Sequence, residues 1–166
     1  MTDLLSMGRQ TLASQPFSRL LGAELEVFRE GAAEIRLPLR TELKQQHGFA
    51  HGGVLCDARP RAALRAKSRK LRDLAVRTAQ RFGADNALTF AGGSVLGTGV
   101  VTSEFKINYV RPALGEALVA RAAVVHAGKS QAVCRCDVFA VKDGVEMLVA
   151  VAQGSIVRMG GGAQKA

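Results

Sequence analysis

The chain has 166 residues, of which 48% are hydrophobic and 22% charged, and this composition indicates one folded domain rather than a disordered chain. No uncharged apolar run approaches the roughly 20 residues that a membrane helix needs, and the first residues lack the basic and apolar regions of a secretory signal. The three cysteines are an odd number, which argues against a disulfide framework. A cytoplasmic protein without a membrane span is therefore expected.

The net charge of +9 is concentrated in one segment of the chain. Residues 57–83 contain seven Arg and two Lys against two Asp, which accounts for +7 of the total. The basic character is thus local and does not predict a basic surface over the whole protein.

The first predicted element is a short amphipathic helix over residues 2–14, which Pro16 then punctuates. Residues 24–29 and 32–39 alternate apolar with polar side chains on either side of a short turn. This period of two predicts a β-hairpin.

A helical region is expected between this hairpin and a second β region. Gly52 and Gly53 can open a helix, residues 84–91 are strongly helical in character, and Gly92, Gly93 and Gly97 are expected to terminate it. In residues 57–83 the apolar positions can share one helical face while arginines occupy much of the remainder, which predicts a basic helical insert.

The second β region contains four alternating or apolar runs, namely residues 101–110, 116–126, 131–141 and 145–158. In the first of these, Phe105, Ile107 and Tyr109 share one face, and the intervening polar residues share the other. The spacing predicts an antiparallel meander.

A hairpin, a helix and a meander together predict an α+β fold with an antiparallel sheet wrapped around a central helix. We expect one domain over residues 1–158 and a flexible tail over residues 159–166.

A glycine-rich motif, QQHGFAHGG at residues 45–53, is interpreted as a strand that leads into a helix N-terminus. Glycines there let a ligand approach the backbone, and free N–H groups at a helix start can stabilise a developing oxyanion. A turn that only connects the strand to the helix is the alternative interpretation.

Asp85 is the candidate general base or nucleophile. Its neighbours Ala84, Ala87 and Leu88 favour burial, where a carboxylate is costly unless it has partners or a task. Thr89 follows four residues later and therefore shares its helical face. Taken by itself, Asp85 is more readily explained as a helix cap.

The motifs HGG, ADNALTFAGG and VTSEFKINYVRP, followed by the basic turn after His126, together resemble the phenylacetyl-CoA/4-hydroxybenzoyl-CoA thioesterase branch of the hot-dog-fold thioesterase superfamily. The resemblance extends over nearly the whole chain outside residues 57–83. It implies a hot-dog fold that hydrolyses an aryl- or medium-chain acyl-CoA thioester to CoA and free acid, with no metal or redox cofactor. It also implies a homodimer or homotetramer, in which the HGG turn and the acid come from different subunits.

The resemblance assigns roles residue by residue. Asp85 would activate water or attack the thioester carbonyl, and Thr89 would assist it. The N–H of Gly53 would bind the carbonyl oxygen, with support from His51. Further residues that the resemblance places near water, substrate or CoA are Gln45, Gln46, Gly52, Asn86, Arg111 and Lys129. The two glutamines stand where the family often has an Asn.

The spacing departs from the family's pattern. An excess of about 25 residues between His51 and Asp85 would displace the acid by ~37 Å in a continuous helix at 1.5 Å per residue. The insert over residues 57–83 must therefore loop out, or the site is broken. It is interpreted as a basic arm for CoA phosphates, nucleic acid or acidic membranes, as a solvated helical excursion, or as the product of a shifted reading frame.

Alternative functions remain open at this point. A catalytically impaired acyl-CoA-binding protein is one, and a hot-dog hydratase or dehydratase that pairs Asp85 with His51 is another. A metal site built from His47, His51 and Cys56 lacks a second cluster of ligands, so no metal is expected. Nucleic acid is not favoured as a partner, because no aromatic residues are interleaved with the basic ones.

Overall fold

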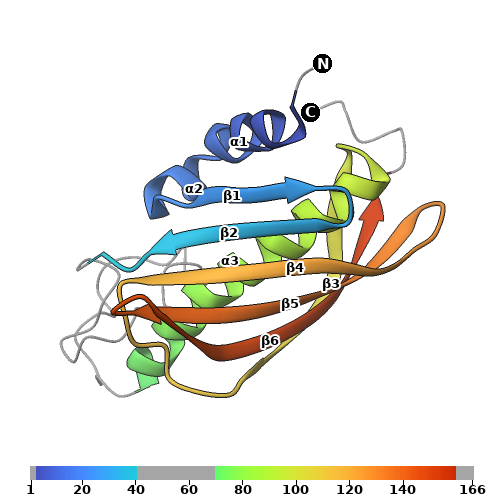
Figure 1. Ribbon diagram of the computed structural model, residues 1–166. Helices are drawn as coiled ribbons and strands as arrows, with labels where there is room; N and C mark the ends of the chain where they lie inside the picture. Colours follow the sequence, from blue (N-terminus) through green and yellow to red (C-terminus); the bar gives the residue numbers. More distant parts are fainter. Residues whose placement is uncertain (1–2, 41–69, 160–166) are drawn as a thin grey trace, which may run out of the picture.

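The computed structural model describes residues 3–40 and 70–159, with side chains described from Gln80 onward in the helix that begins at Lys70. Its elements in chain order are α1 (Leu4–Ser14), α2 (Pro16–Leu21), β1 (Glu24–Arg29), β2 (Ala32–Pro38), α3 (Lys70–Leu96), β3 (Val100–Tyr109), β4 (Ala117–Ala127), β5 (Gln131–Lys142) and β6 (Val145–Arg158) (Figure 1). Of the basic segment, residues 57–69 lie outside the described residues, and residues 70–83 form the first part of α3. No helix in the described ranges is long and apolar enough to cross a membrane.

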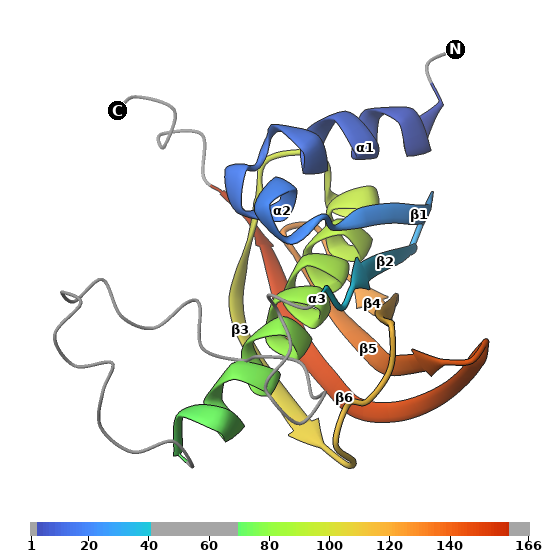
Figure 2. The ribbon, with the colours of Figure 1, turned by 90° about the vertical axis from the view of Figure 1, so that its left-hand side faces the viewer.

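The six strands form one antiparallel sheet in the order β1-β2-β4-β5-β6-β3. The sheet curves around α3, which packs against all of its strands, as the two ribbon views show (Figures 1 and 2). This arrangement confirms the predicted sheet wrapped around a central helix. The predicted meander is right for β4, β5 and β6 but wrong for β3, which lies at the sheet edge beside β6. Alternation within a strand does not encode which distant strand pairs with it.

The core lies between the concave face of the sheet and α3. Strand positions that alternate with polar ones supply Ile35, Leu37 and Val138, each no more than 1% exposed. The helix supplies Ala87 and Leu88, which are fully buried. Small residues on the helix let the sheet approach closely, so period two in the strands and a small-residue face on the helix specify the same core.

The N-terminal helices differ from their prediction at Pro16. Asp3 caps α1 by accepting a hydrogen bond from the Leu5 N–H at 3.3 Å. Pro16 does more than punctuate this helix, because it occupies the first turn of the separate helix α2. A proline suits that position, where its missing N–H has no helical partner in any case.

The predicted end of α3 is right at Gly97 but wrong at Gly92 and Gly93. The helix continues through Gly92 and Gly93 to Leu96, and Gly97, with a φ of +99°, ends it. A Cβ on Gly92 would lie 2.6 Å from the Cβ of Ile156 on β6. Gly92 is therefore required by the contact between helix and sheet rather than by the end of the helix.

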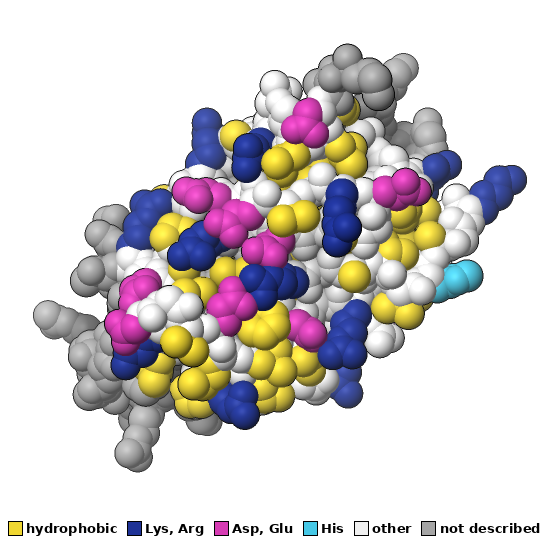
Figure 3. All heavy atoms as spheres, viewed as in Figure 1, with side chains coloured by type: hydrophobic (Ala, Val, Ile, Leu, Met, Phe, Trp, Pro, Cys, Tyr) yellow, Lys and Arg dark blue, Asp and Glu magenta, His cyan; other side chains and the backbone are white. Residues whose placement is uncertain are grey.

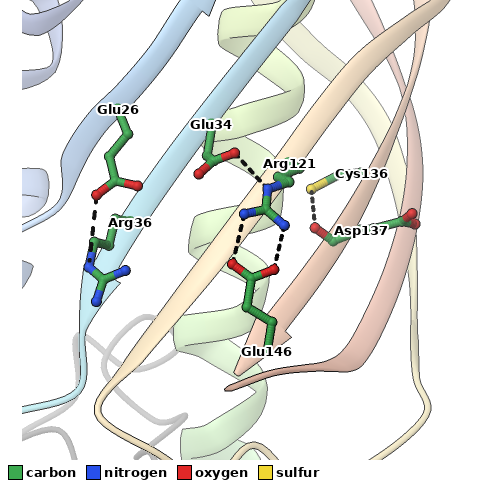
Figure 4. A network of polar contacts seen from close by, with 7 residues as sticks. All are labelled: Glu26, Glu34, Arg36, Arg121, Cys136, Asp137 and Glu146. Carbon is green, nitrogen blue, oxygen red and sulfur yellow. Dashed lines mark hydrogen bonds and ion pairs between the residues drawn. The ribbon is translucent and has the colours of Figure 1, made fainter. Parts of the chain in front are cut away.

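The convex face of the sheet carries paired charges (Figure 4). Arg121 on β4 donates to Glu34 at 2.6 Å and makes two bonds to Glu146, at 2.6 and 2.7 Å. Its hydrogen bonds to the two carboxylates raise the pKa of Arg121, and its hydrogen bonds to Glu146 lower the pKa of that carboxyl. Figure 3 shows both signs of charge interspersed on this face. These charged side chains pair with one another, so they do not by themselves indicate a binding site.

Candidate active site

Asp85 lies well inside α3, on the side of the helix that faces β3. Its neighbours Ala84 and Ala87 are fully buried, whereas Asp85 itself is partly accessible. Because α3 begins at Lys70, Asp85 is far from the helix start and the helix-cap interpretation is wrong. The Thr102 hydroxyl on β3 donates to Asp85 Oδ1 at 2.8 Å.

Thr89 completes a cluster of three side chains, Asp85, Thr89 and Thr102, which we call the acid cluster. The hydroxyl oxygens of Thr89 and Thr102 are 2.8 Å apart, and the Thr89 hydroxyl donates to the backbone carbonyl oxygen of Asp85 at 2.8 Å. A hydroxyl has one proton to donate. The Thr89 proton can therefore go either to that carbonyl oxygen or to Thr102, while Thr102 donates to the carboxylate of Asp85.

Thr102 was not expected to belong to the site, because simple alternation places it on the face opposite Phe105. The pairing with β6 explains the difference, since Thr102 lies opposite Ile156 and Glu104 opposite Ser155, so that one residue of β3 has no partner. This β-bulge turns both Thr102 and Phe105 toward α3.

The sequence contains one signal for this bulge. Gly154 is a glycine inside strand β6, and an internal strand glycine often marks a bulge or a close backbone approach. A Cβ on Gly154 would lie 2.7 Å from the Cβ of Phe105 and 2.8 Å from the carbonyl oxygen of Glu104.

The other predicted residues in the described ranges are Asn86, Arg111 and Lys129. Asn86 donates to the carbonyl oxygen of Phe82 at 3.1 Å. Arg111 is exposed and donates to the carbonyl oxygen of Leu148 at 3.1 Å, and nine residues of extended chain separate it from Thr102, or ~30 Å along a strand. Lys129 is exposed in the turn between β4 and β5. Among the described residues, no hydrogen bond or ion pair joins these three side chains to the Asp85 carboxylate.

The glycine-rich half of the predicted site lies outside the described residues. This half comprises Gln45, Gln46, His51, Gly52 and Gly53. Its roles remain predictions, as does its distance from Asp85.

A cation lies one helical turn before the acid. The guanidinium of Arg81 is 5.1 Å from the centre of the Phe105 ring, within the range of a cation–π contact. In the described parts of the chain, no group of three or more His, Cys, Asp or Glu side chains is arranged to hold a metal ion.

The sequence profile of the Thioesterase superfamily matches residues 47–147, more than half of the chain. The chain belongs to the thioesterase superfamily. The match includes the whole acid cluster and supports the resemblance drawn from the sequence motifs. No curated protein sequence matched the chain.

Solved structures of similar proteins agree with this family and with its hot-dog fold. A thioesterase family protein from Silicibacter pomeroyi is 27% identical with a TM-score of 0.75, and the match covers 96% of this chain and 100% of that one. A conserved protein from Pseudomonas aeruginosa is 26% identical with a TM-score of 0.66, over 90% of this chain and 98% of that one. A mutant of the phenylacetic acid degradation protein PaaI from Thermus thermophilus is 25% identical with a TM-score of 0.62, over 87% and 100% respectively.

Proposed function

We propose that this thioesterase-superfamily chain hydrolyses an acyl-CoA thioester to CoA and a carboxylic acid, with Asp85 as the general base. The observation that carries the proposal is the acid cluster. A partly accessible carboxylate lies among fully buried alanines and is oriented by the Thr102 hydroxyl at 2.8 Å. A partly accessible carboxylate that a neighbouring hydroxyl holds in place can accept a proton from water.

In the proposed reaction, Asp85 takes a proton from water as the water oxygen attacks the thioester carbonyl carbon. Thr102 donates to Oδ1, so within the described residues the other carboxylate oxygen is free to accept from water. Collapse of the tetrahedral intermediate breaks the C–S bond, and the same proton returns from Asp85 to the thiolate of CoA. The Gly53 N–H would stabilise the oxyanion from a helix start.

We further propose that two copies of the chain form each site. The acid cluster lies at the β3 side of the sheet, and β3 is the last strand in the strand order. An edge strand of ten residues presents unpaired backbone groups that another strand can satisfy. A partner docked there is suitably placed to bring its own His51–Gly53 turn to Asp85, in a homodimer or homotetramer.

Substitution of Asp85 by Asn tests the general base. Asn keeps the shape and can still accept the Thr102 hydrogen bond, but it cannot take a proton. We expect thiol release from a panel of aryl- and fatty-acyl-CoA esters to fall by roughly 10²–10⁴-fold.

The matched control is Asp143→Asn in the turn between β5 and β6. Asp143 has a φ of 51°, a conformation that Asn also tolerates, and it is exposed. We expect this variant to retain wild-type rates. Full activity in Asp85→Asn would rule out the proposed base, whereas tight CoA-ester binding without turnover by the wild type would favour a non-catalytic binding protein.

A further inference from the structure

A pocket of about 320 Å³ lies between α1 and the C-terminal part of α3. Figure 2 shows α1 lying across this end of the central helix. Leu4 and Met7 of α1 line it on one side, Thr89 and Phe90 of α3 on the other, and Phe28 of β1 closes a third side. Val100 at the start of β3 also lines the pocket, so residues from four elements bound it.

The side chains that line the pocket are uncharged. None of the lining residues is Asp, Glu, Lys, Arg or His. Phe28 and Phe90 meet edge to face with ring centres 5.4 Å apart, which gives the pocket an aromatic wall. Such a wall favours apolar groups and rejects a group with its own charge, because a buried charge needs a partner.

The pocket is continuous with the acid cluster through Thr89. This residue lines the pocket, and its hydroxyl lies 2.8 Å from that of Thr102, which in turn donates to Asp85. The hydroxyls of Thr89 and Thr102 thus connect the pocket to the carboxylate that is proposed to activate water.

The wall formed by α1 is fixed to the sheet. A Cβ on Gly8 would lie 2.5 Å from Cδ1 of Phe28, so the helix and the ring are in close contact there. Arg9 Nε donates to the carbonyl oxygen of Leu25 at 3.0 Å. Met7, which also lines the pocket, remains 43% exposed although it is apolar. A flexible thioether in that place adapts well to an apolar ligand.

We propose that this pocket is the acyl subsite and that Met7 limits the size of the acyl group it accepts. The proposal rests on the proposed thioester hydrolysis and names its substrate class, namely uncharged aryl or medium-chain acyl groups rather than acyl groups with a distal carboxylate. The volume is at the lower end of the roughly 300–1,000 Å³ of small-molecule sites, so it suits the acyl group and leaves CoA outside.

Substitution of Met7 by Trp tests the proposal by filling the pocket. We expect kcat/KM for octanoyl-CoA and phenylacetyl-CoA to fall at least tenfold, while kcat/KM for acetyl-CoA stays within about twofold of wild type. Met7→Ala should act in the opposite direction and shift the preference toward longer chains, by about three- to fourfold for each additional methylene that becomes buried.

Met147→Trp is the matched control. Met147 lies on β6, is 53% exposed and does not line the pocket. We expect it to leave the chain-length profile unchanged. A profile that stays unchanged in Met7→Trp, or an equal loss for acetyl- and octanoyl-CoA, would overturn the acyl subsite.

A binding measurement separates this proposal from the proposed hydrolysis. Calorimetry with the non-hydrolysable thioether S-octyl-CoA and with CoA itself needs no turnover. We expect the wild type to bind the thioether at least tenfold more tightly, and Met7→Trp to lose that difference. If the wild type binds S-octyl-CoA and CoA equally, the subsite is overturned even if esters are hydrolysed. If the wild type binds S-octyl-CoA more tightly but hydrolyses no ester, only the proposed hydrolysis is overturned.

Discussion

At the scale of single residues, the acid cluster shows what local sequence patterns can find. Asp85 and Thr89 are predictable together, because residues four apart share a helical face and an acid among alanines is conspicuous. Thr102 is not predictable from alternation, because a single unpaired residue in β3 reverses the face on which it lies. In the sequence, the signal for this bulge is Gly154 in the neighbouring strand β6.

Thr102 is expected to act as a positioning residue for Asp85. Thr102→Val keeps the shape but removes a hydrogen bond to a carboxylate, a loss of about 1.5–3 kcal/mol. We expect kcat to fall roughly 10- to 100-fold with KM little changed, and Thr102→Ser to restore most of the rate. Equal impairment in the Ser and Val variants would instead point to a packing role.

The thiols of Cys134 and Cys136 predict a loss of stability at alkaline pH. Both side chains are fully buried, and burial raises the pKa of Cys134 to about 11 and that of Cys136 further, with Asp137 adding to the latter. An unfolded thiol ionises near pH 9, so the unfolded state alone loses protons as the pH rises above that value. This contribution to stability is complete below pH 9 and is lost toward pH 11.

Urea unfolding at pH 8, 9 and 10 measures this effect. We expect the free energy of unfolding to fall over this range in the wild type, and to fall less steeply in Cys134→Ala, whatever constant offset the substitution introduces. Parallel slopes for the two proteins would show that the thiol does not contribute.

At the scale of elements, the strands are predicted well, whereas the end of α3 is predicted at Gly97 but also, wrongly, at Gly92. Period two places Cys134, Cys136 and Val138 on the buried face of β5, as observed. Gly92 was misinterpreted because a glycine needed for helix–sheet contact and a glycine that ends a helix look the same in sequence. The position of Ile156 decides between them, and that is tertiary information.

Two neighbouring glycines of α3 provide a test of this contact. In Gly92→Ala the new Cβ would overlap Ile156, and we expect a loss of about 1–3 kcal/mol in the free energy of unfolding. In Gly93→Ala the nearest atom is Cγ2 of Val100 at 3.3 Å, and alanine favours the helix, so we expect a change within about 1 kcal/mol. Equal effects in urea unfolding would contradict the assignment.

At the scale of the whole molecule, the family and the central arrangement were predictable, whereas the complete site was not. The order of strands depends on pairing between distant segments, and the place of β3 beside β6 illustrates this. The proposed site also joins two chains, and no local pattern fixes the distance between groups on different subunits.

Assembly through β3 predicts that activity depends on association. Light scattering should give a mass at least twice the 17.6 kDa of one chain. Specific activity should fall on dilution in parallel with the fraction of oligomer. A fully active monomer would exclude a site shared between subunits and would require both halves to come from one chain.

The bulge in β3 has a consequence for how this strand can vary. Before Ser103 the even-numbered residues of β3, including Thr102, face α3, as the acid cluster requires. After Ser103 the odd-numbered residues, including Phe105, face α3, as the core requires. The alternation of inward and outward side chains in β3 therefore shifts by one residue at Ser103. Loss of that residue would force a choice, because a regular strand can direct the hydroxyl of Thr102 or the ring of Phe105 toward the helix, but never both.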